Sequence, residues 1–402
     1  MKDLKDNSGQ LNASAESRRN FIKKTGSIIA LASLAGPLEV FAQENSTQLN
    51  DAPKNIKTKG YAARSDDGIL SPYEFERRAL QDDDVQIEIL FCGVCHSDIH
   101  TVKGHWGKAH YPLVPGHEIA GKVVAVGKNV TKFKVGDKAG VGCMVDSCGT
   151  CDSCKDGLEQ YCEKGAAWTY DSQDKILGGF TQGGYSKTIV VKEHFVISIP
   201  DSIELSAAAP LLCAGITTYS PVMAWKIKKG MKVGVAGIGG LGHVAIKLAV
   251  SKGAEVTAFT TTQSKVDDIK RFGAKEVVVV DDTKSLRNYS GSQDYLISTI
   301  PQNYDINSYI RLVKRNGTFT QVGVPGDQYS LHPMVLVGSG VNINGSLIGG
   351  IPETQDVVNY CAENNIAPEI KMINIEDIND AYDKVVNKEA RYRYVIDMSK
   401  YV

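Results

Sequence analysis

The chain has 402 residues, of which 42% are hydrophobic and 23% are charged, a globular composition long enough for more than one core. Its formal net charge is −1, with basic and acidic residues interspersed, which excludes the basic stripe of a nucleic-acid-binding protein and the basic face of a membrane-surface protein. We therefore expect a small-molecule substrate and no nucleic-acid partner.

The first 42 residues predict an export signal. Residues 17–24 read SRRNFIKK, and a short apolar run, SIIALASLAG, follows at 27–36. Paired arginines, a following phenylalanine and a weakly apolar core are typical of a bacterial twin-arginine signal peptide. Because the run is shorter than the roughly 20 apolar residues of a membrane span, we expect no stable membrane insertion. The expected location is the periplasm, with cleavage near Ala42; the alternative is an amphipathic N-terminal helix on a cytoplasmic protein.

The region after this signal predicts a β-rich, barrel-like domain. Short apolar segments separated by glycine turns are typical of strands in such a domain. They read VQIEILFCG (85–93), IAGKVVAVG (119–127), DKAGVG (137–142) and YSKTIVV (185–191).

Three segments each offer one residue type that zinc prefers. The candidates are Cys95, His117 and Cys213, in GVCHSDIH (93–100), VPGHEIAG (114–121) and PLLCAGITTYSP (210–221). Each has an ordinary alternative: Cys213 as a core cysteine, His117 as a turn residue, and Cys92 with Cys95 as a redox C-x-x-C pair. The three together, in this order around a cysteine-rich loop, favour a common metal site over these alternatives.

The cysteine-rich loop reads CGTCDSCKDGLEQYC. Its spacing, C-x2-C-x2-C-x7-C, allows four thiolates to surround one tetrahedral zinc. Two disulfides are the alternative, but C-x2-C pairs would close strained rings. Twin-arginine substrates also fold in the cytoplasm, where thiols stay reduced. The loop therefore predicts a structural zinc, with no open position for chemistry, held by Cys148, Cys151, Cys154 and Cys162.

A glycine-rich segment predicts a dinucleotide-binding loop. Residues 231–242 read MKVGVAGIGGLG, in which an apolar strand runs into the G-x-G-x-x-G spacing, and a helix-like HVAIKLAVSKG follows. Backbone amides and a helix N-terminus in this context attract pyrophosphate. The expected cofactor contacts are Gly237, Gly239, Gly240, Leu241 and Gly242.

The residues after the next strand favour NADP(H) over NAD(H). NAD-binding proteins usually carry an acid about twenty residues past the glycines, which binds the ribose 2′-hydroxyl. Here EVTAF (255–259) leads into neutral residues and then Lys265. Hydroxyls and a lysine accept a 2′-phosphate, so we expect Thr261, Thr262 and Lys265 to bind it. The alternative for Lys265 is a solvated helix residue.

Further strand-like segments alternate with helical ones. They read FGAKEVVVVDD, DYLISTI and GTFTQVGV. Such alternation predicts a doubly wound parallel sheet, so the fold class is α/β plus a β-barrel-like domain.

Seven stretches between roughly residues 60 and 400 resemble the zinc-dependent medium-chain alcohol dehydrogenases, closest to the cinnamyl-alcohol-dehydrogenase and aldehyde-reductase branch. They are GVCHSDIH, VPGHEIAGKVVAVG, KVGDKAGVG, the cysteine loop, PLLCAGITTYSP, GIGGLGHVAIKLA and RYRYVIDM. The resemblance implies a GroES-like catalytic domain over 43–212 plus 350–402, a Rossmann domain over 213–349, and a homodimer.

The resemblance also implies roles at the metal site. Cys95, His117 and Cys213 would bind a catalytic zinc, which needs three protein ligands and an exchangeable position. Glu118 would be its resting fourth ligand or a near neighbour. Asp98 would hold the ligand histidine in its tautomer.

Around the cofactor, the resemblance implies a proton relay and further contacts. Ser97 would give a proton to the substrate alkoxide, relayed through the cofactor ribose to His100 and water. His96 would contact the cofactor phosphates. Thr217 and the SLIGG segment that begins at Ser346 would lie on the nicotinamide side.

Four residues receive less definite readings. Cys92 becomes a strand-end core thiol, and Cys143 and Cys361 receive no role. Trp106 either lines an apolar pocket, which would suit aromatic or medium-length aldehydes, or packs in the core.

The predicted function is reversible hydride transfer between NADP(H) and primary alcohols or aldehydes, in the direction of aldehyde reduction. The expected cofactors are one catalytic zinc, one structural zinc and NADP(H). A non-catalytic zinc or thiol protein is one alternative, which the glycine loop and the Ser97/His100 pair disfavour. A polyol dehydrogenase is the other, and the missing acid after EVTAF disfavours it.

Overall fold

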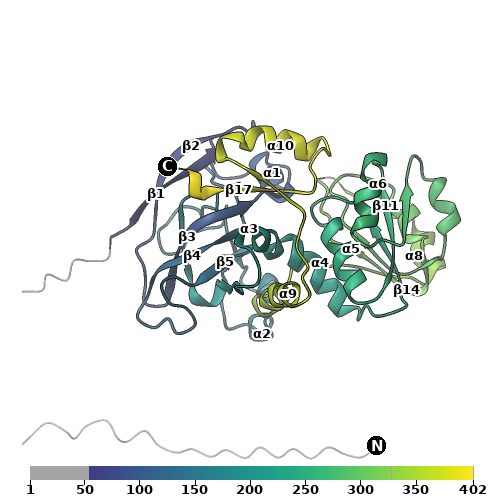
Figure 1. The fold of residues 1–402 in the computed structure, drawn as a ribbon, viewed down its shortest axis with the longest axis horizontal. Coiled ribbons are helices and arrows are strands. Elements are labelled where there is room, and N and C mark those ends of the chain that lie inside the picture. The colour runs from purple at the N-terminus through teal and green to yellow at the C-terminus, as the bar shows by residue number, and fades with distance from the viewer. Residues whose placement is uncertain (1–53, 327, 402) are drawn as a thin grey trace, which may run out of the picture. The chain divides into compact units, whose positions relative to one another are not determined.

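Two large β-sheets form the framework that the sequence predicts (Figure 1). The structure is a computed structural model that describes residues 54–401 except residue 327. These residues belong to one unit, Asp51–Val402. The predicted signal peptide, 1–42, lies outside the described residues.

The first sheet is the predicted β-rich part, and most of its neighbours are antiparallel. Its strand order is β16-β17-β3-β4-β5-β9, with β8 paired to β3, and the hairpin β1–β2 forms a separate small sheet. The strands are β1 (Ile56–Ala63), β2 (Leu70–Arg77), β3 (Asp84–Gly93), β4 (Ile119–Val126), β5 (Lys138–Val141), β8 (Thr188–Lys192), β9 (Ile197–Ser198), β16 (Ile370–Ile373) and β17 (Arg393–Asp397). The last two strands show that the chain returns to this sheet at its C-terminus.

The second sheet has six parallel strands in the order β12-β11-β10-β13-β14-β15. Its strands are β10 (Lys232–Ala236), β11 (Glu255–Thr260), β12 (Glu276–Val279), β13 (Gln293–Ser298), β14 (Val313–Gln321) and β15 (Asn342–Gly345). Its helices are α5 (Gly242–Ser251), α6 (Val266–Arg271), α7 (Ile306–Ile310) and α8 (Pro333–Ser339). The central strands are apolar on both faces because helices cover both faces, which confirms the predicted doubly wound sheet.

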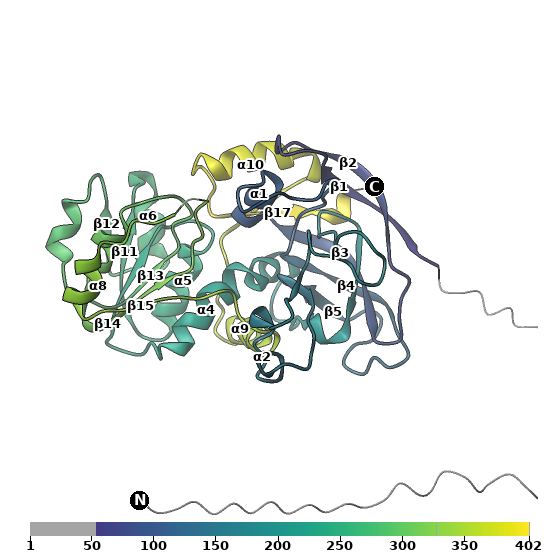
Figure 2. The ribbon, with the colours of Figure 1, turned by 180° about the vertical axis from the view of Figure 1, so that it is seen from behind.

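Helices α4 (Ala214–Ala224) and α9 (Ile351–Glu363) lie between the two sheets in both ribbon views (Figures 1 and 2). Their buried apolar side chains, such as Ile216 on α4 and Val357 on α9, share a core with Leu248 on α5. This shared core fixes the position of the residues just before α4 and α9. The predicted domain crossings near 212 and 350 stay a prediction.

Further short elements complete the parts of the chain between these strands and helices. They are α1 (His96–Val102), β6 (Met144–Asp146), α2 (Asp152–Lys155), the 3₁₀ helix η1 (Glu159–Tyr161), β7 (Ala167–Trp168), α3 (Leu205–Ala208) and α10 (Ile378–Val386).

In residues 54–401, leaving out 327, no single helix has both the length and the apolar composition of a membrane span. One bent pair of segments, Leu205–Leu212 and Ala214–Ala224, passes that test only when taken together, across a 57° bend.

Candidate functional site

A cavity of about 780 Å³ collects most of the predicted site residues. Its walls come from α1, the start of α4, the glycine loop, the segment after β11 and the segment after β15. The predicted residues that line it are Cys95, His96, Ser97, His100, His117, Cys213, Thr217, Gly237, Gly239, Gly240, Leu241, Thr261, Thr262, Lys265 and Ser346. Metal-ligand candidates and nucleotide-loop candidates therefore share one cavity.

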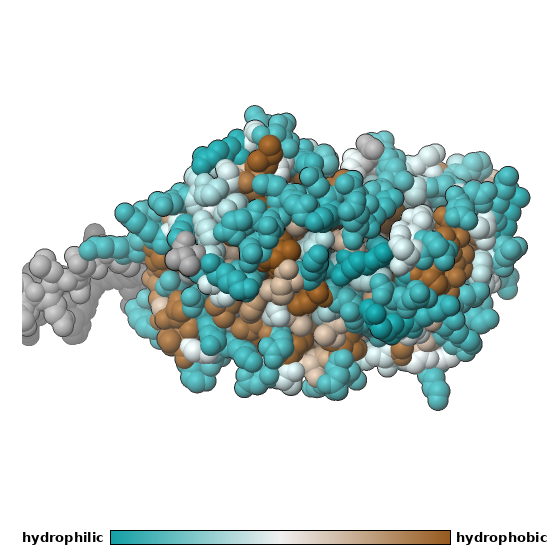
Figure 3. All heavy atoms as spheres, turned by 45° about the horizontal axis from the view of Figure 1, so that its top comes forward, coloured by the Kyte–Doolittle hydropathy of each residue, from teal (hydrophilic) through white to brown (hydrophobic). Residues whose placement is uncertain are grey.

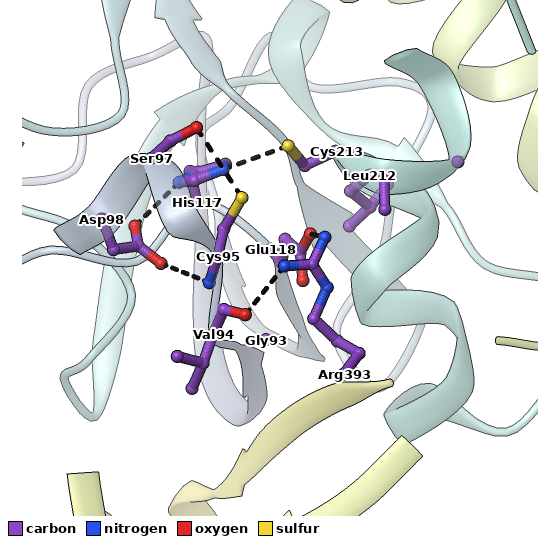
Figure 4. Close-up of polar contacts among 12 residues, drawn as sticks. Gly93, Val94, Cys95, Ser97, Asp98, His117, Glu118, Leu212, Cys213 and Arg393 are labelled. Atoms are coloured by element: carbon purple, nitrogen blue, oxygen red, sulfur yellow. Dashed lines mark hydrogen bonds and ion pairs between the residues drawn. The ribbon is translucent and has the colours of Figure 1, made fainter. Parts of the chain in front are cut away.

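Four buried side chains converge at the base of this cavity (Figure 4). The ligand atoms of Cys95, His117, Glu118 and Cys213 all lie within 4.8 Å of one another, and Nε2 of His117 is 3.1 Å from Sγ of Cys213. Cys95 precedes α1, His117 and Glu118 precede β4, and Cys213 precedes α4. Two sulfurs and an imidazole at this spacing fit one tetrahedral zinc.

Asp98 orients the imidazole of His117, although it does not line the cavity. Its Oδ1 is 2.9 Å from Nδ1 of His117, which leaves Nε2 facing the sulfurs. The same fully buried carboxylate accepts hydrogen bonds from the amides of Cys95 and Gly116 and from the hydroxyl of Tyr185, at 2.9, 3.1 and 3.0 Å. Burial lowers the pKa of His117, but the Asp98 carboxylate outweighs it and raises that pKa well above its usual value.

Glu118 faces a cation that the sequence did not identify. Its Oε1 lies 3.2 Å from Nη2 of Arg393, and both side chains are almost fully buried. Burial raises the pKa of Glu118 to about 8, and Arg393 opposes that rise. Arg393 also donates a hydrogen bond to the carbonyl of Val94, at 2.8 Å (Figure 4). The position of Arg393 in RYRYVIDM did not predict its contact with Glu118.

The four-cysteine loop forms a second cluster away from the cavity. The sulfurs of Cys148, Cys151, Cys154 and Cys162 lie within 4.8 Å of one another, and no disulfide links any of them. The amides of Thr150 and Cys151 donate to Sγ of Cys148, which lowers the pKa of that thiol to about 5. A thiolate held by backbone amides is the form that binds zinc, so the loop fits a four-thiolate structural site.

The glycine loop has the geometry of a pyrophosphate site. Gly237 has φ +83°, a conformation that favours glycine. A Cβ on Gly242 would lie 2.1 Å from the carbonyl oxygen of Gly237, so only glycine permits this close approach. Helix α5 begins at Gly242, directly after the cavity-lining residues 239–241, and a helix N-terminus at this place favours an anion.

Comparisons with known proteins agree with this geometry. Residues 81–201 match the alcohol dehydrogenase GroES-like domain, and residues 240–363 match the zinc-binding dehydrogenase domain. The chain is 49% identical to NADP-dependent alcohol dehydrogenase C 1 of Mycolicibacterium smegmatis, over 84% of this chain and 97% of the relative. It is 46% identical to aldehyde reductase YahK of Escherichia coli, over 85% and 98%.

A solved structure gives the same result. The cinnamyl alcohol dehydrogenase of Helicobacter pylori, complexed with NADP(H), is 45% identical, with a TM-score of 0.83 over 86% of this chain and 99% of that one. This chain belongs to the zinc-dependent medium-chain alcohol dehydrogenase family. The GroES-like and Rossmann fold predicted from the sequence is confirmed.

Lys265 of this dehydrogenase is buried, so the alternative of a solvated helix residue is wrong. Its Nζ donates to the carbonyl of Ile238 in the glycine loop, at 3.1 Å, and lies 5.3 Å from the ring centre of Tyr392. Burial, together with the nearby positive charges of Arg391 and Lys388, lowers the pKa of Lys265 to about 8. The lysine thus contacts the glycine loop and the cavity at once.

His100 of the dehydrogenase joins the cavity to the surface. Its Nε2 is buried and has no hydrogen-bond partner among the described residues, whereas its Nδ1 is 2.9 Å from Nδ1 of the exposed His105. Burial lowers the pKa of His100 to about 4, so the ring is neutral at physiological pH. Trp106 stacks on His100 with ring centres 4.9 Å apart and lines the cavity. Trp106 is therefore a wall residue rather than core packing.

The remaining cysteines of the dehydrogenase fall into two groups. Cys92 and Cys361 are buried free thiols, and burial raises the pKa of both, as expected for core residues. Cys143, for which we predicted no role, lines the cavity beside Cys213, and a hydrogen bond from Cys213 lowers its pKa. Both Cys92 and Cys95 are free thiols, and Cys95 lies in the cavity cluster with His117 and Cys213, which favours the role of metal ligand for Cys95.

Proposed function

We propose that this chain catalyses reversible hydride transfer between NADP(H) and primary alcohols or aldehydes, in the direction of aldehyde reduction. The observation that carries the proposal is the shared cavity, in which Cys95, His117 and Cys213 converge beside the glycine loop and Lys265. The relatives named NADP-dependent alcohol dehydrogenase and aldehyde reductase support the same reaction.

In this proposal Cys95, His117 and Cys213 hold a catalytic zinc, and Glu118 is its alternative ligand. The burial of all four and their spacing within 4.8 Å support this set. The four-cysteine loop holds a structural zinc. When bound, the catalytic zinc supplies a Lewis acid for the carbonyl oxygen and the nicotinamide supplies the hydride.

Ser97 and His100 deliver the proton that converts the alkoxide into the product alcohol. Ser97 lines the cavity, and its Oγ lies 3.7 Å from Sγ of Cys95, within reach of a substrate oxygen at the metal site. The unpartnered Nε2 of His100 faces inward, and its Nδ1 contacts His105. The two sides of the ring therefore offer a path for a proton between the cavity and the surface.

The preference for NADP(H) rests on a set of cations and hydroxyls after β11. Thr261, Thr262 and Lys265 line the cavity, and no carboxylate stands among residues 260–265. Arg391 donates to Oγ of Ser264 at 2.8 Å, which adds a positive charge beside this segment. A 2′-phosphate is the ligand that such a set favours over a 2′-hydroxyl.

The other cofactor contacts are assigned by position. His96, Thr217 and Ser346 line the same cavity, and we propose that they contact the cofactor as the resemblance implies. Trp106 and Leu347 add apolar wall surface, which suits aromatic or medium-length aldehydes. The absence of an acid after β11 disfavours a polyol dehydrogenase, and the Ser97/His100 pair in the cavity disfavours a non-catalytic protein.

We further propose a homodimer. Strand β15 is the last strand of the six-stranded sheet, and the neighbouring α8 exposes Met334, Leu336 and Val337. Exposed apolar side chains beside a sheet edge are a surface that a second copy can cover. Figure 3 shows one face of the molecule, on which hydrophobic patches lie among a largely hydrophilic surface. Light scattering of the purified protein tests the assembly, and a monomer at micromolar concentration contradicts it.

Twin-arginine export to the periplasm is also proposed, on the sequence of residues 17–36 alone. Fractionation of expressing cells, with detection of the enzyme by size, tests it. Unprocessed protein found only in the cytoplasm would rule it out.

A substrate panel with NADPH and NADH side by side tests the main proposal. The zinc-loaded protein is expected to oxidise NADPH in the presence of aromatic and medium-length aldehydes, and NADH much more slowly. A clear NADH preference would contradict the role of Lys265, and no aldehyde-dependent oxidation at all would favour a non-catalytic protein.

The pH dependence of cofactor binding tests whether Lys265 binds the 2′-phosphate of NADP(H). Because Lys265 has a pKa lowered to about 8, it loses its charge as the pH rises through that value in the free protein. Affinity for NADPH is therefore present below pH 8 and should weaken by up to about tenfold per pH unit above it. Affinity for NADH should not follow this curve, because it carries no 2′-phosphate. Fluorescence titration between pH 7 and 9.5 measures both.

A further inference from the structure

Glu159 is a fully buried carboxylate that the proposed chemistry does not use. It begins η1, between the third and fourth cysteines of the loop. Its Oε1 lies 2.6 Å from Nε2 of His194, and its Oε2 accepts a hydrogen bond from the amide of Ile351 at 2.9 Å. Ile351 is the first residue of α9, so the carboxylate satisfies a free amide at a helix N-terminus. The cysteine loop thus reaches an element that begins next to the cavity.

Backbone packing joins the same two regions. A Cβ on Gly350, the residue before α9, would lie 1.6 Å from the carbonyl oxygen of Gly157 in the loop. Pro352 also packs against Gly157, since a Cβ on Gly157 would lie 2.9 Å from the Pro352 ring. Further along, Oη of Tyr161 accepts a hydrogen bond from the amide of Leu347 at 3.3 Å. The loop therefore holds the segment before α9 at two points.

The held segment contains a strained residue. Ile348 has φ +39°, in the left-handed region that β-branched side chains avoid. It lines the cavity, together with Ser346 and Leu347. Such a conformation persists only where its surroundings hold it. The contacts from the loop, to Leu347 on one side of Ile348 and to Ile351 on the other, are in the right places to do so.

The metal site in turn shapes the part of the loop that makes these contacts. The amide of Gly157 donates to the carbonyl of Cys154 at 3.2 Å, and the amide of Cys162 donates to the carbonyl of Glu159 at 3.0 Å. Residues 155–161 are thus closed between two cysteines of the cluster. A bound metal cross-links the four sulfurs, and without it the thiols take up protons and nothing joins them, so loss of the metal would release this turn.

We propose that the four-cysteine loop, when loaded with metal, positions the cavity segment 346–351 through Glu159 and Tyr161, so that its metal occupancy is coupled to the binding of the nicotinamide cofactor. Glu159 is a positioning residue, because its carboxylate neither lines the cavity nor belongs to the cysteine cluster. The inference rests on the proposed function only in taking NADP(H) as the ligand of the cavity. Coupling between two binding equilibria is reciprocal, so bound NADPH must also raise the affinity of the loop for its metal.

The test uses the full chain loaded with ¹¹³Cd, since the four-thiolate and mixed-ligand sites give separate resonances. A chelator of known affinity is titrated with and without NADPH, and the fraction of the four-thiolate resonance that remains at equilibrium is measured. NADPH binding to the zinc-loaded protein is measured separately by fluorescence. Glu159→Ala removes the acceptor for Ile351, Tyr161→Phe removes the acceptor for Leu347, and Glu163→Gln, an exposed acid just past Cys162, is the matched control.

NADPH is expected to protect the metal of the wild-type loop by raising its affinity about fivefold or more, the lower end of measured couplings. Glu159→Ala and Tyr161→Phe should each reduce this protection and weaken NADPH binding, whereas Glu163→Gln should behave as wild type. Full protection in both variants overturns the inference. If Glu159→Ala does not fold, Tyr161→Phe decides alone. A wild-type protein that binds no NADPH overturns the proposed function instead.

Discussion

The four-cysteine loop takes its ligands from fifteen consecutive residues, Cys148–Cys162, whereas the cavity cluster takes its ligands from segments that precede α1, β4 and α4. Two of the loop cysteines are half-buried, and all four residues of the cavity cluster are buried. A local site needs its metal to keep its own turn folded. A site assembled by the fold keeps its shape from the cores around it and uses its metal for chemistry.

The largest difference between the two clusters should appear in turnover. Cys213→Ser removes one thiolate from the cavity cluster, so the protein should lose one equivalent of metal and aldehyde reduction should fall by about a thousandfold or more. Metal analysis and steady-state rates measure both, and circular dichroism should be unchanged. Cys143→Ser, a thiol on the same cavity wall, is the control. Full metal content with normal turnover in Cys213→Ser would contradict the assigned ligand set.

A substitution in the four-cysteine loop should lower thermal stability more than it lowers turnover. Cys151→Ser breaks the loop site, so the melting temperature should fall by about 5 °C or more, because metal binding contributes folding free energy. Any loss of turnover should appear chiefly in the KM for NADPH. Calorimetry and kinetics separate these effects, with Asp152→Asn as an exposed neighbouring control. An unchanged melting temperature would mean that the loop keeps its shape without metal.

The same contrast explains what the sequence could predict. The cysteine loop was identified by spacing, since ligands close in sequence are close in space. The order of Cys95, His117 and Cys213 around the cysteine loop favours a common metal site, and the family resemblance supplies their roles, because no spacing rule links segments brought together by packing. The parallel sheet and the glycine loop were predicted because strand and turn signals are local.

The residues that the sequence did not identify all make long-range contacts. Arg393 faces Glu118, and Tyr185 donates to Asp98, across contacts between distant segments. Lys265 was predicted to contact a phosphate from its charge and its position in the sequence. Its burial beside Tyr392 was not predicted, because that contact is made by tertiary packing. Buried polar groups find their partners only when distant segments pack together, so these pairs leave no periodic pattern in the sequence.

A smaller loss of metal affinity is expected when a residue that contacts a cavity ligand is changed. Asp98 is such a residue, because its buried carboxylate contacts His117. Asp98→Asn replaces the carboxylate beside Nδ1 of His117, so the imidazole loses the partner that fixes its tautomer. Metal affinity at the cavity cluster should fall by about 10- to 100-fold, with the loop metal retained. Competition with a chelator measures it. Asp171→Asn, which removes a cavity-wall carboxylate that contacts His110 instead, should leave affinity unchanged.

The smallest effect is expected one contact further out. Tyr185→Phe removes only the hydroxyl that donates to Oδ2 of Asp98 at 3.0 Å, and that carboxylate keeps its hydrogen bonds from the amides of Cys95 and Gly116. A hydrogen bond to a carboxylate contributes about 1.5 kcal/mol or more, but this one acts on the metal only through Asp98 and His117. Its loss should therefore weaken cavity metal binding only about fivefold, and the loop site should not respond. A chelator titration resolves this when Tyr401→Phe, whose hydroxyl contacts Gly60, is the reference. If Tyr185→Phe costs as much as Asp98→Asn, the hydroxyl and the carboxylate act as one unit, and the cavity cluster depends on a network rather than on its direct contacts.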